Sequence, residues 1–221
     1  MLKSGYTAII DYQIGNLFSV QNALQYVGLE AVITSDKNVI SRADAVVLPG
    51  VGAFGDAMKS LDRLDLAAPI KESIDSGKPF MGICLGLQLL FTESEEFGRN
   101  RGLDIIPGCV RKFPTGAMYK NHIVKVPQIA WNRINKASQN WDHTVLDGVK
   151  DGEYMYFVHS YYVVPDNDAD LFTMTEYGGI NFCSSIRRDN VFASQFHPEK
   201  SSMAGIAILK NFKTTVDQQF K

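Results

Sequence analysis

Short apolar runs rich in β-forming residues alternate with segments of helical spacing in the first half of the chain, and this alternation limits the fold more than any other feature. Strands alternating with helices predict a parallel sheet that is covered by helices on both faces. In such sheets, ligands bind at the carboxyl ends of the strands. The predicted strands are 7–11, 31–34, 45–50 and 78–83, and the predicted helices are 16–27, 54–61 and 67–76.

The second half, from about residue 108, has a different pattern of strands joined by turns, and helical spacing returns only over 202–212. This pattern predicts a more antiparallel extension of the same sheet, closed by a C-terminal helix. Because no repeat or linker marks a boundary, we predict a single α/β domain over 1–221, with a mostly parallel central sheet flanked by helices. The predicted strands here are 108–113, 122–126, 154–164, 171–177, 181–188 and 191–197.

Composition excludes several classes of function. Among 221 residues, 22 Lys and Arg face 24 Asp and Glu, so no positive excess favours nucleic acid or an anionic membrane. No apolar run approaches the roughly 20 residues of a membrane span, and the N-terminus does not resemble a signal peptide, so we expect a soluble cytoplasmic protein. Cys84, Cys109 and Cys183 lack the spacing of a disulfide framework or zinc site, and we predict no metal and no cofactor.

Cys84 lies between Gly82 and Gly86, where a predicted strand passes into helical spacing. The G-x-C-x-G pattern is typical of a sharp strand–nucleophile–helix turn that lifts the nucleophile above the sheet. The start of the helix also favours a thiolate over a thiol. The alternative is an inert buried thiol, with glycines that only allow the helix to pack closely against the strand.

His197 and Glu199 follow the last predicted strand, on either side of Pro198. A cysteine nucleophile needs an imidazole to accept its proton, and the imidazole needs a carboxylate to fix its tautomer. Residues two apart on an extended segment point to the same side, so the two side chains are expected to meet. The alternative for His197 alone is a surface or structural histidine.

Three separated motifs carry a family resemblance: "PGVGAFGDAM" (49–58), "GICLGLQLLF" (82–91) and "FHPEKS" (196–201). Over essentially its whole length the chain resembles the class I, or triad-type, glutamine amidotransferases. The resemblance implies that Cys84 attacks the side-chain amide of L-glutamine, forming a thioester and releasing ammonia. It also implies that His197 serves as base and then acid, and that Glu199 orients it.

The same resemblance implies an oxyanion hole formed by the backbone N–H groups of Leu85 and Val51. The Gly50–Val51 peptide then has to turn its N–H towards the oxyanion, and Gly50 and Gly52 lower the steric cost of that change. Both glycines are also implied to contribute backbone to the substrate site. An ordinary glycine-rich turn between strand and helix is the alternative for this loop.

Further roles are implied for residues outside the triad. By resemblance, Gln88 holds the substrate glutamine, and Ser160 and Tyr161 close over its amino-acid head. Asn16 and Trp131 are implied to lie where a partner docks, whereas their plain interpretations are a helix cap and a core residue.

"IIDYQIGNLFSVQNAL", "PQIAWN" and "YFVHSYY" are most similar to the glutaminase subunits of imidazole glycerol phosphate synthase. This similarity implies a heterodimer with a (β/α)8 cyclase subunit that makes imidazole glycerol phosphate and AICAR in histidine biosynthesis. Gln13 and Ala130 replace glycines usual in that group, so a paralogue that supplies ammonia for amination of a surface sugar is an alternative. Two further alternatives are a free-standing cysteine hydrolase for γ-glutamyl compounds and a non-enzymatic scaffold. A scaffold, however, is expected to have lost the triad.

Overall fold

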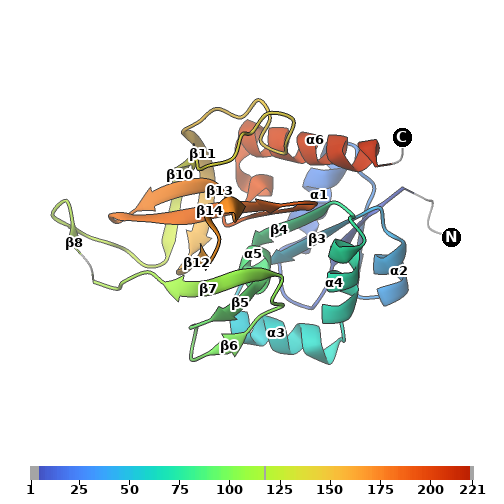
Figure 1. The fold of residues 1–221 in the computed structure, drawn as a ribbon, viewed down its shortest axis with the longest axis horizontal. Helices are drawn as coiled ribbons and strands as arrows, with labels where there is room; N and C mark the ends of the chain where they lie inside the picture. Colours follow the sequence, from blue (N-terminus) through green and yellow to red (C-terminus); the bar gives the residue numbers. More distant parts are fainter. Residues whose placement is uncertain (1–4, 117, 220–221) are drawn as a thin grey trace.

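A central sheet with helices on both faces forms the first half of the protein, as predicted (Figure 1). The computed structural model describes residues 5–116 and 118–219. The elements of this half are β1 (Thr7–Ile10), α1 (Leu17–Tyr26), β2 (Ala31–Thr34), α2 (Lys37–Arg42), β3 (Ala45–Gly50), α3 (Phe54–Arg63), α4 (Ala67–Asp75), β4 (Phe80–Cys84) and α5 (Leu85–Leu89).

The second half adds antiparallel strands and the long C-terminal helix. Within the described ranges, 13 strands share one sheet, and β8 and β9 form a separate hairpin that projects from the body of the protein (Figure 1). The elements are β5 (Phe91–Ser94), β6 (Asn100–Arg101), β7 (Ile106–Lys112), β8 (Met118–Tyr119), β9 (His122–Ile123), β10 (Gln128–Lys136), β11 (Glu153–His159), β12 (Tyr161–Pro165), η1 (Asp168–Asp170), β13 (Leu171–Tyr177), β14 (Ile180–Arg188), β15 (Val191–Ser194), η2 (Pro198–Lys200) and α6 (Ser202–Gln218).

The parallel core has the strand order β2-β1-β3-β4-β15, and β14 then pairs antiparallel with β15. Successive residues of each strand face opposite sides. On β3, Val46 and Leu48 therefore pack with α2 to α5, whereas Val47 packs with α1 and α6. Burial on both faces explains why these strands are continuous apolar runs.

Several predicted elements differ from the structure. The predicted strand 122–126 is only two residues long, and 154–164 is two strands that meet at Ser160. The helix after Cys84 ends at Leu89, and Phe91 begins β5 instead of continuing the helix. Helix α2 and strand β10 were not predicted.

The carboxyl ends of β3, β4 and β15 meet at one edge of the sheet. Gly50 is in register with Cys84, and Ser194 is in register with Ile83 on β4. The register therefore brings the loop after β3, the thiol and the segment after β15 to the same place.

Candidate active site

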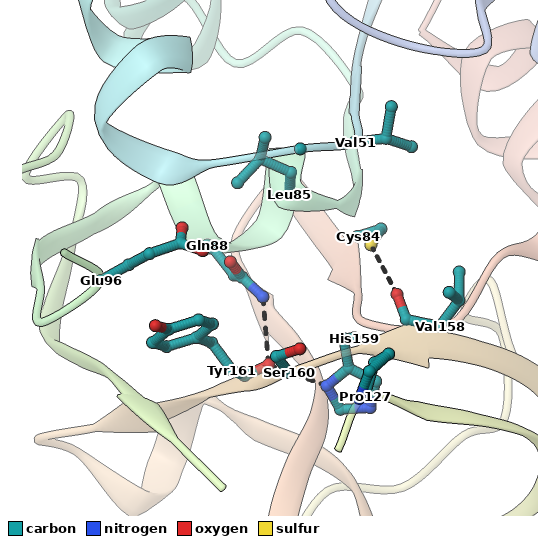
Figure 2. Close-up of a pocket in the computed structure, with 11 residues that line it drawn as sticks. Val51, Cys84, Leu85, Gln88, Glu96, Pro127, Val158, His159, Ser160 and Tyr161 are labelled. Atoms are coloured by element: carbon teal, nitrogen blue, oxygen red, sulfur yellow. Dashed lines mark hydrogen bonds between the residues drawn. The ribbon is translucent and has the colours of Figure 1, made fainter.

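Cys84 is the last residue of β4 and directly precedes α5, at a sharp turn with φ 55° and ψ −108°. Positive φ is strained for a residue with a side chain, and such strain is concentrated at functional sites. The turn requires Gly86, because a Cβ there would lie 1.8 Å from the backbone oxygen of Leu48. The Sγ atom lies 3.8 Å from the carbonyl oxygen of Val158, as Figure 2 shows.

His197 and Glu199 meet through a turn of η2 and not on an extended segment, which corrects the local geometry expected from the sequence. His197 Nδ1 lies 2.8 Å from Glu199 Oε1, and the two side chains are 3% and 2% exposed. The segment is tightly held: His197 N–H donates to Tyr156 O at 3.0 Å, and the Ser201 hydroxyl donates to His197 O at 2.6 Å. The imidazole is therefore fixed at one nitrogen by a carboxylate.

The other nitrogen of His197, Nε2, is buried and has no hydrogen-bond partner in the part of the chain that the structure describes. Burial lowers the pKa of His197, but its interactions with Cys84 and Glu199 outweigh burial and raise that pKa to about 10. This arrangement favours a charged imidazole beside the thiol, as a thiolate–imidazolium pair requires.

A cavity of about 260 Å³ opens beside Cys84 (Figure 2). Cys84 and most of the residues expected at the oxyanion and substrate sites line it, but His197, Glu199, Asn16 and Trp131 do not. Gly50 does not line it either, although it pairs with Cys84. Its lining comprises Val51, Gly52, Cys84, Leu85, Gln88, Glu96, Pro127, Val158, His159, Ser160 and Tyr161.

Asn16 and Trp131 are surface residues. Asn16 occupies the N-cap position of α1, but its side chain makes no capping hydrogen bond. Trp131 on β10 is 49% exposed and so is not a core residue, and the neighbouring Ile129 is also exposed. The ring of Trp131 packs against Tyr156, with the ring centroids 6.0 Å apart.

Glu96 lines the cavity but was not among the predicted site residues. Its Oε2 accepts a hydrogen bond of 2.6 Å from the backbone N–H of Phe54 at the start of α3. Burial raises the pKa of Glu96, and this hydrogen bond partly opposes the change. In Figure 2 its carboxylate lies beside Gln88, on the side away from Cys84. The contact with Phe54 joins residues that are 42 positions apart in the sequence.

His159 lines the cavity as a buried side chain whose hydrogen bonds hold neighbouring segments together. Its Nδ1 lies 2.8 Å from Tyr161 O, and its Nε2 lies 3.1 Å from the side-chain amide of Gln128. Burial lowers the pKa of His159 to about 4, so the ring is neutral and has one N–H, which Tyr161 O accepts. Nε2 is then an acceptor, and the Gln128 amide has to present its nitrogen to it.

Among the described side chains, no group of three or more His, Cys, Asp or Glu is arranged to hold a metal ion. Within the same residues, no helix has both the length and the apolar character needed to cross a membrane.

Comparison with known proteins identifies the family of this chain. Residues 8–215 match the family model "Glutamine amidotransferase class-I". The chain is 51% identical to imidazole glycerol phosphate synthase subunit HisH of Syntrophotalea carbinolica, over 92% of this chain and 97% of the relative. It is 50% identical to the HisH subunit of Aquifex aeolicus, over 96% and 98% of the two chains.

Solved structures support the fold. The structure of PurLQS from Thermotoga maritima superposes with a TM-score of 0.71 at 18% identity, covering 99% of this chain and 100% of that one. A crystal structure of a glutamine amidotransferase gives a TM-score of 0.69 at 16% identity, covering 96% and 100%. The chain belongs to the class I glutamine amidotransferases and, within them, to the imidazole glycerol phosphate synthase HisH subunits.

Proposed function

We propose that the chain is a glutaminase that hydrolyses L-glutamine to glutamate and ammonia and passes the ammonia to a cyclase partner subunit. The partner makes imidazole glycerol phosphate and AICAR in histidine biosynthesis. One observation carries the proposal: the Cys84 thiol lines a cavity of about 260 Å³ and interacts with the imidazole of the buried His197–Glu199 pair, in a chain half identical to HisH subunits.

In the proposed reaction, the Cys84 thiolate attacks the side-chain amide carbon of glutamine. His197, which holds the proton taken from the thiol, gives it to the leaving nitrogen, so that the C–N bond breaks, ammonia leaves and a thioester remains. A water molecule then loses a proton to His197 and attacks the thioester, and the C–S bond breaks. Glutamate leaves and the thiol is restored, while Glu199 holds the imidazole throughout.

The oxyanion formed in both steps needs hydrogen-bond donors, and we assign the backbone N–H groups of Leu85 and Val51. Leu85 is the first residue of α5, directly after the nucleophile. The Val51 side chain has no hydrogen-bond donor and points away from the cavity in Figure 2, so only its backbone N–H can serve this role. Adding one such donor is worth about 10²–10³ in rate. The orientation of the Gly50–Val51 peptide therefore sets the activity.

Hydrogen bonds within the protein define how Gln88 can bind the substrate. Its Nε2 donates to Tyr161 O at 3.2 Å and to Gln195 Oε1 at 3.0 Å, which uses both amide hydrogens. Oε1 is left as an acceptor for a donor on the substrate, and the Glu96 carboxylate lies beside it (Figure 2). An acceptor next to a carboxylate suits the α-ammonium group of glutamine. Ser160 and Tyr161 line the same cavity, and we assign them to the amino-acid head of the substrate.

We propose that the partner is a (β/α)8 barrel and that it docks as a heterodimer over Asn16 and Trp131. The exposed indole and the adjacent Ile129 give this surface an apolar centre, which is typical of interface anchors. We also place the protein in the cytoplasm, because Cys84, Cys109 and Cys183 are all free thiols, as in a reducing compartment.

The surface-sugar alternative rested on Gln13 and Ala130. The curated relatives at 45–51% identity are subunits of imidazole glycerol phosphate synthase, which favours the histidine pathway. Gln13 has φ 68°, a conformation that glycine adopts easily, and Arg63 donates a hydrogen bond to its side chain. The substitution therefore keeps the backbone shape that a glycine would give.

The test is steady-state glutamine turnover by the isolated chain and by its complex with the cyclase subunit, with and without the cyclase's nucleotide substrate. If one oxyanion donor is restored on docking, turnover rises by about 10²–10³. Full activity of the isolated chain would contradict the proposal that docking of the partner restores the oxyanion donor. No turnover in either sample would contradict the function itself.

A further inference from the structure

Gln195 is a fully buried residue beside the nucleophile, and none of the roles described above explains it. It lies between β15 and His197, where its backbone N–H donates to Ser184 O at 2.8 Å. Its side-chain Nε2 lies 3.5 Å from Cys84 Sγ. A polar side chain without exposure has to satisfy its hydrogen bonds inside the protein, so its partners define its role.

A backbone carbonyl fixes the orientation of this amide. Tyr161 O can only accept, so the group of Gln88 that lies 3.2 Å from it must be the amide nitrogen, which can only donate. The same nitrogen lies 3.0 Å from the Gln195 side chain, which must therefore present its oxygen to Gln88. The nitrogen of Gln195 is then left to face the sulfur.

We propose that Gln195 is a further catalytic residue, whose side-chain amide donates a hydrogen bond to the Cys84 sulfur and favours the thiolate, and that Gln88 holds this amide in the donating orientation. The inference rests on the proposed role of Cys84 as the nucleophile. No bond to carbon changes in this step: the proton leaves Sγ for His197 Nε2, and the Gln195 N–H stabilises the charge that remains on sulfur.

The sulfur also has a contact that favours the thiol. Val158 O lies 3.8 Å from Sγ and can accept only from an S–H group. The Gln195 N–H, at 3.5 Å, can donate to the sulfur in either state and binds an anion more strongly than a neutral atom. The contact with Gln195, which is the shorter of the two, is thus the one that strengthens when the thiol ionises. Two titratable groups also act on the sulfur, His197 from the segment after β15 and Tyr12 from the segment after β1.

The experiment follows alkylation of Cys84 by iodoacetamide as a function of pH in the full-length chain carrying Cys109→Ser. Burial raises the pKa of the Cys183 thiol, so this residue stays unreactive. Gln195→Met removes the donor at similar volume, and Gln195→Glu replaces it with an acceptor. Since a hydrogen bond to a charged group is lost, the midpoint pH of alkylation should rise by about one unit in Gln195→Met and further in Gln195→Glu.

Glutamine turnover by the complex gives a second measurement. Gln195→Met should lower it roughly tenfold near pH 7, and the deficit should shrink as the pH is raised, which a purely structural defect would not do. Gln88→Met keeps Gln195 but removes the hydrogen bond that orients its amide, so the alkylation midpoint should rise less than in Gln195→Met. The control is Gln139→Glu, because the Gln139 amide donates to Ala169 O and Arg187 O and has no contact with the site.

Unchanged alkylation midpoints in Gln195→Met and Gln195→Glu would overturn the proposal. Thermal unfolding identifies any variant that does not fold. If Gln195→Met is unstable, Gln195→Glu takes its place, because it keeps the side-chain shape and the acceptor for Gln88. If both variants are unstable, the alkylation midpoint of Gln88→Met decides. Alkylation needs no glutamine, so its result does not depend on the proposed function. The proposed function is tested separately and would fail if Cys84→Ala retained glutamine turnover.

Discussion

Replacement of Glu199 by Gln should slow glutamine turnover roughly tenfold to a hundredfold without unfolding the protein. Glu199 Oε1 lies 2.8 Å from His197 Nδ1, and both side chains are almost completely buried. A hydrogen bond to a charged group contributes about 1.5–3 kcal/mol, and about 1.4 kcal/mol of activation free energy is a factor of ten in rate. The glutamine keeps the shape of the side chain but removes the charge that stabilises the imidazolium.

The assay is glutamate release by the complex with the cyclase subunit, with Glu72→Gln on the exposed surface of α4 as the matched control. An NMR titration of His197 gives an independent measurement. Because Glu199 is one of the groups that raise the pKa of His197 to about 10, the variant should show a lower value. If kcat stayed within twofold of the wild type, the assignment of Glu199 as the partner of the base would be wrong.

Four further outcomes are expected. Cys84→Ala should abolish glutamine turnover while partner binding, measured by calorimetry, is retained; residual turnover would rule out Cys84 as the nucleophile. Glu96→Gln should raise KM for glutamine roughly tenfold with little change in kcat, since a contact made equally in ground and transition states is lost; an unchanged KM would remove Glu96 from the substrate site. Gly86→Ala should lower the free energy of unfolding by at least about 2 kcal/mol, measured in urea, because the new Cβ would lie 1.8 Å from Leu48 O; a wild-type midpoint would refute the packing argument. The folded-state pKa of His197 is raised from 6.5 to about 10. Its contribution to the free energy of unfolding is therefore complete below pH 6.5 and is lost as the pH rises to about 10. In His197→Asn the free energy of unfolding should vary less with pH over that range.

The parallel half of the fold could be predicted from the sequence because its strands are buried on both faces and its helices on one. The predicted bounds of β2 and β3 agree with the structure. Helix α2 escaped prediction because it is six residues long and buries only Ile40, too little for a periodic signal.

The antiparallel half was less predictable because its strands depend on partners far along the chain. Only the polar pair His159 and Ser160 interrupts the run 154–164, with no glycine or proline to mark a turn. The chain nevertheless turns at Ser160, and β11 pairs with β10 whereas β12 pairs with β7. Only two residues of the predicted strand 122–126 pair, in the short β8–β9 hairpin. Pairing of this kind is set by tertiary contacts more than by local propensity.

The same limit applies to the site. Cys84, His197 and Glu199 stand in motifs whose spacing is readable, and the structure brings them to one sheet edge. Glu96 belongs to no such motif, and Gln195 directly precedes the motif at 196–201, where nothing local distinguishes its role. They reach the site through contacts between residues 42 and 111 positions apart, so a local pattern does not predict them.

The proposed docking surface and the proposed base are connected through one strand, β11. Trp131 pairs with Tyr156 across β10 and β11, and the Tyr156 ring lies 6.3 Å from the His197 ring. The backbone of Tyr156 also accepts from His197 N–H and donates to the Ser201 hydroxyl, which in turn donates to His197 O. Two residues further along the same strand, Val158 O contacts the Cys84 sulfur. We therefore expect a partner docked on the exposed indole to act on the supports of both the proposed base and the proposed nucleophile, by a route separate from the Gly50–Val51 peptide.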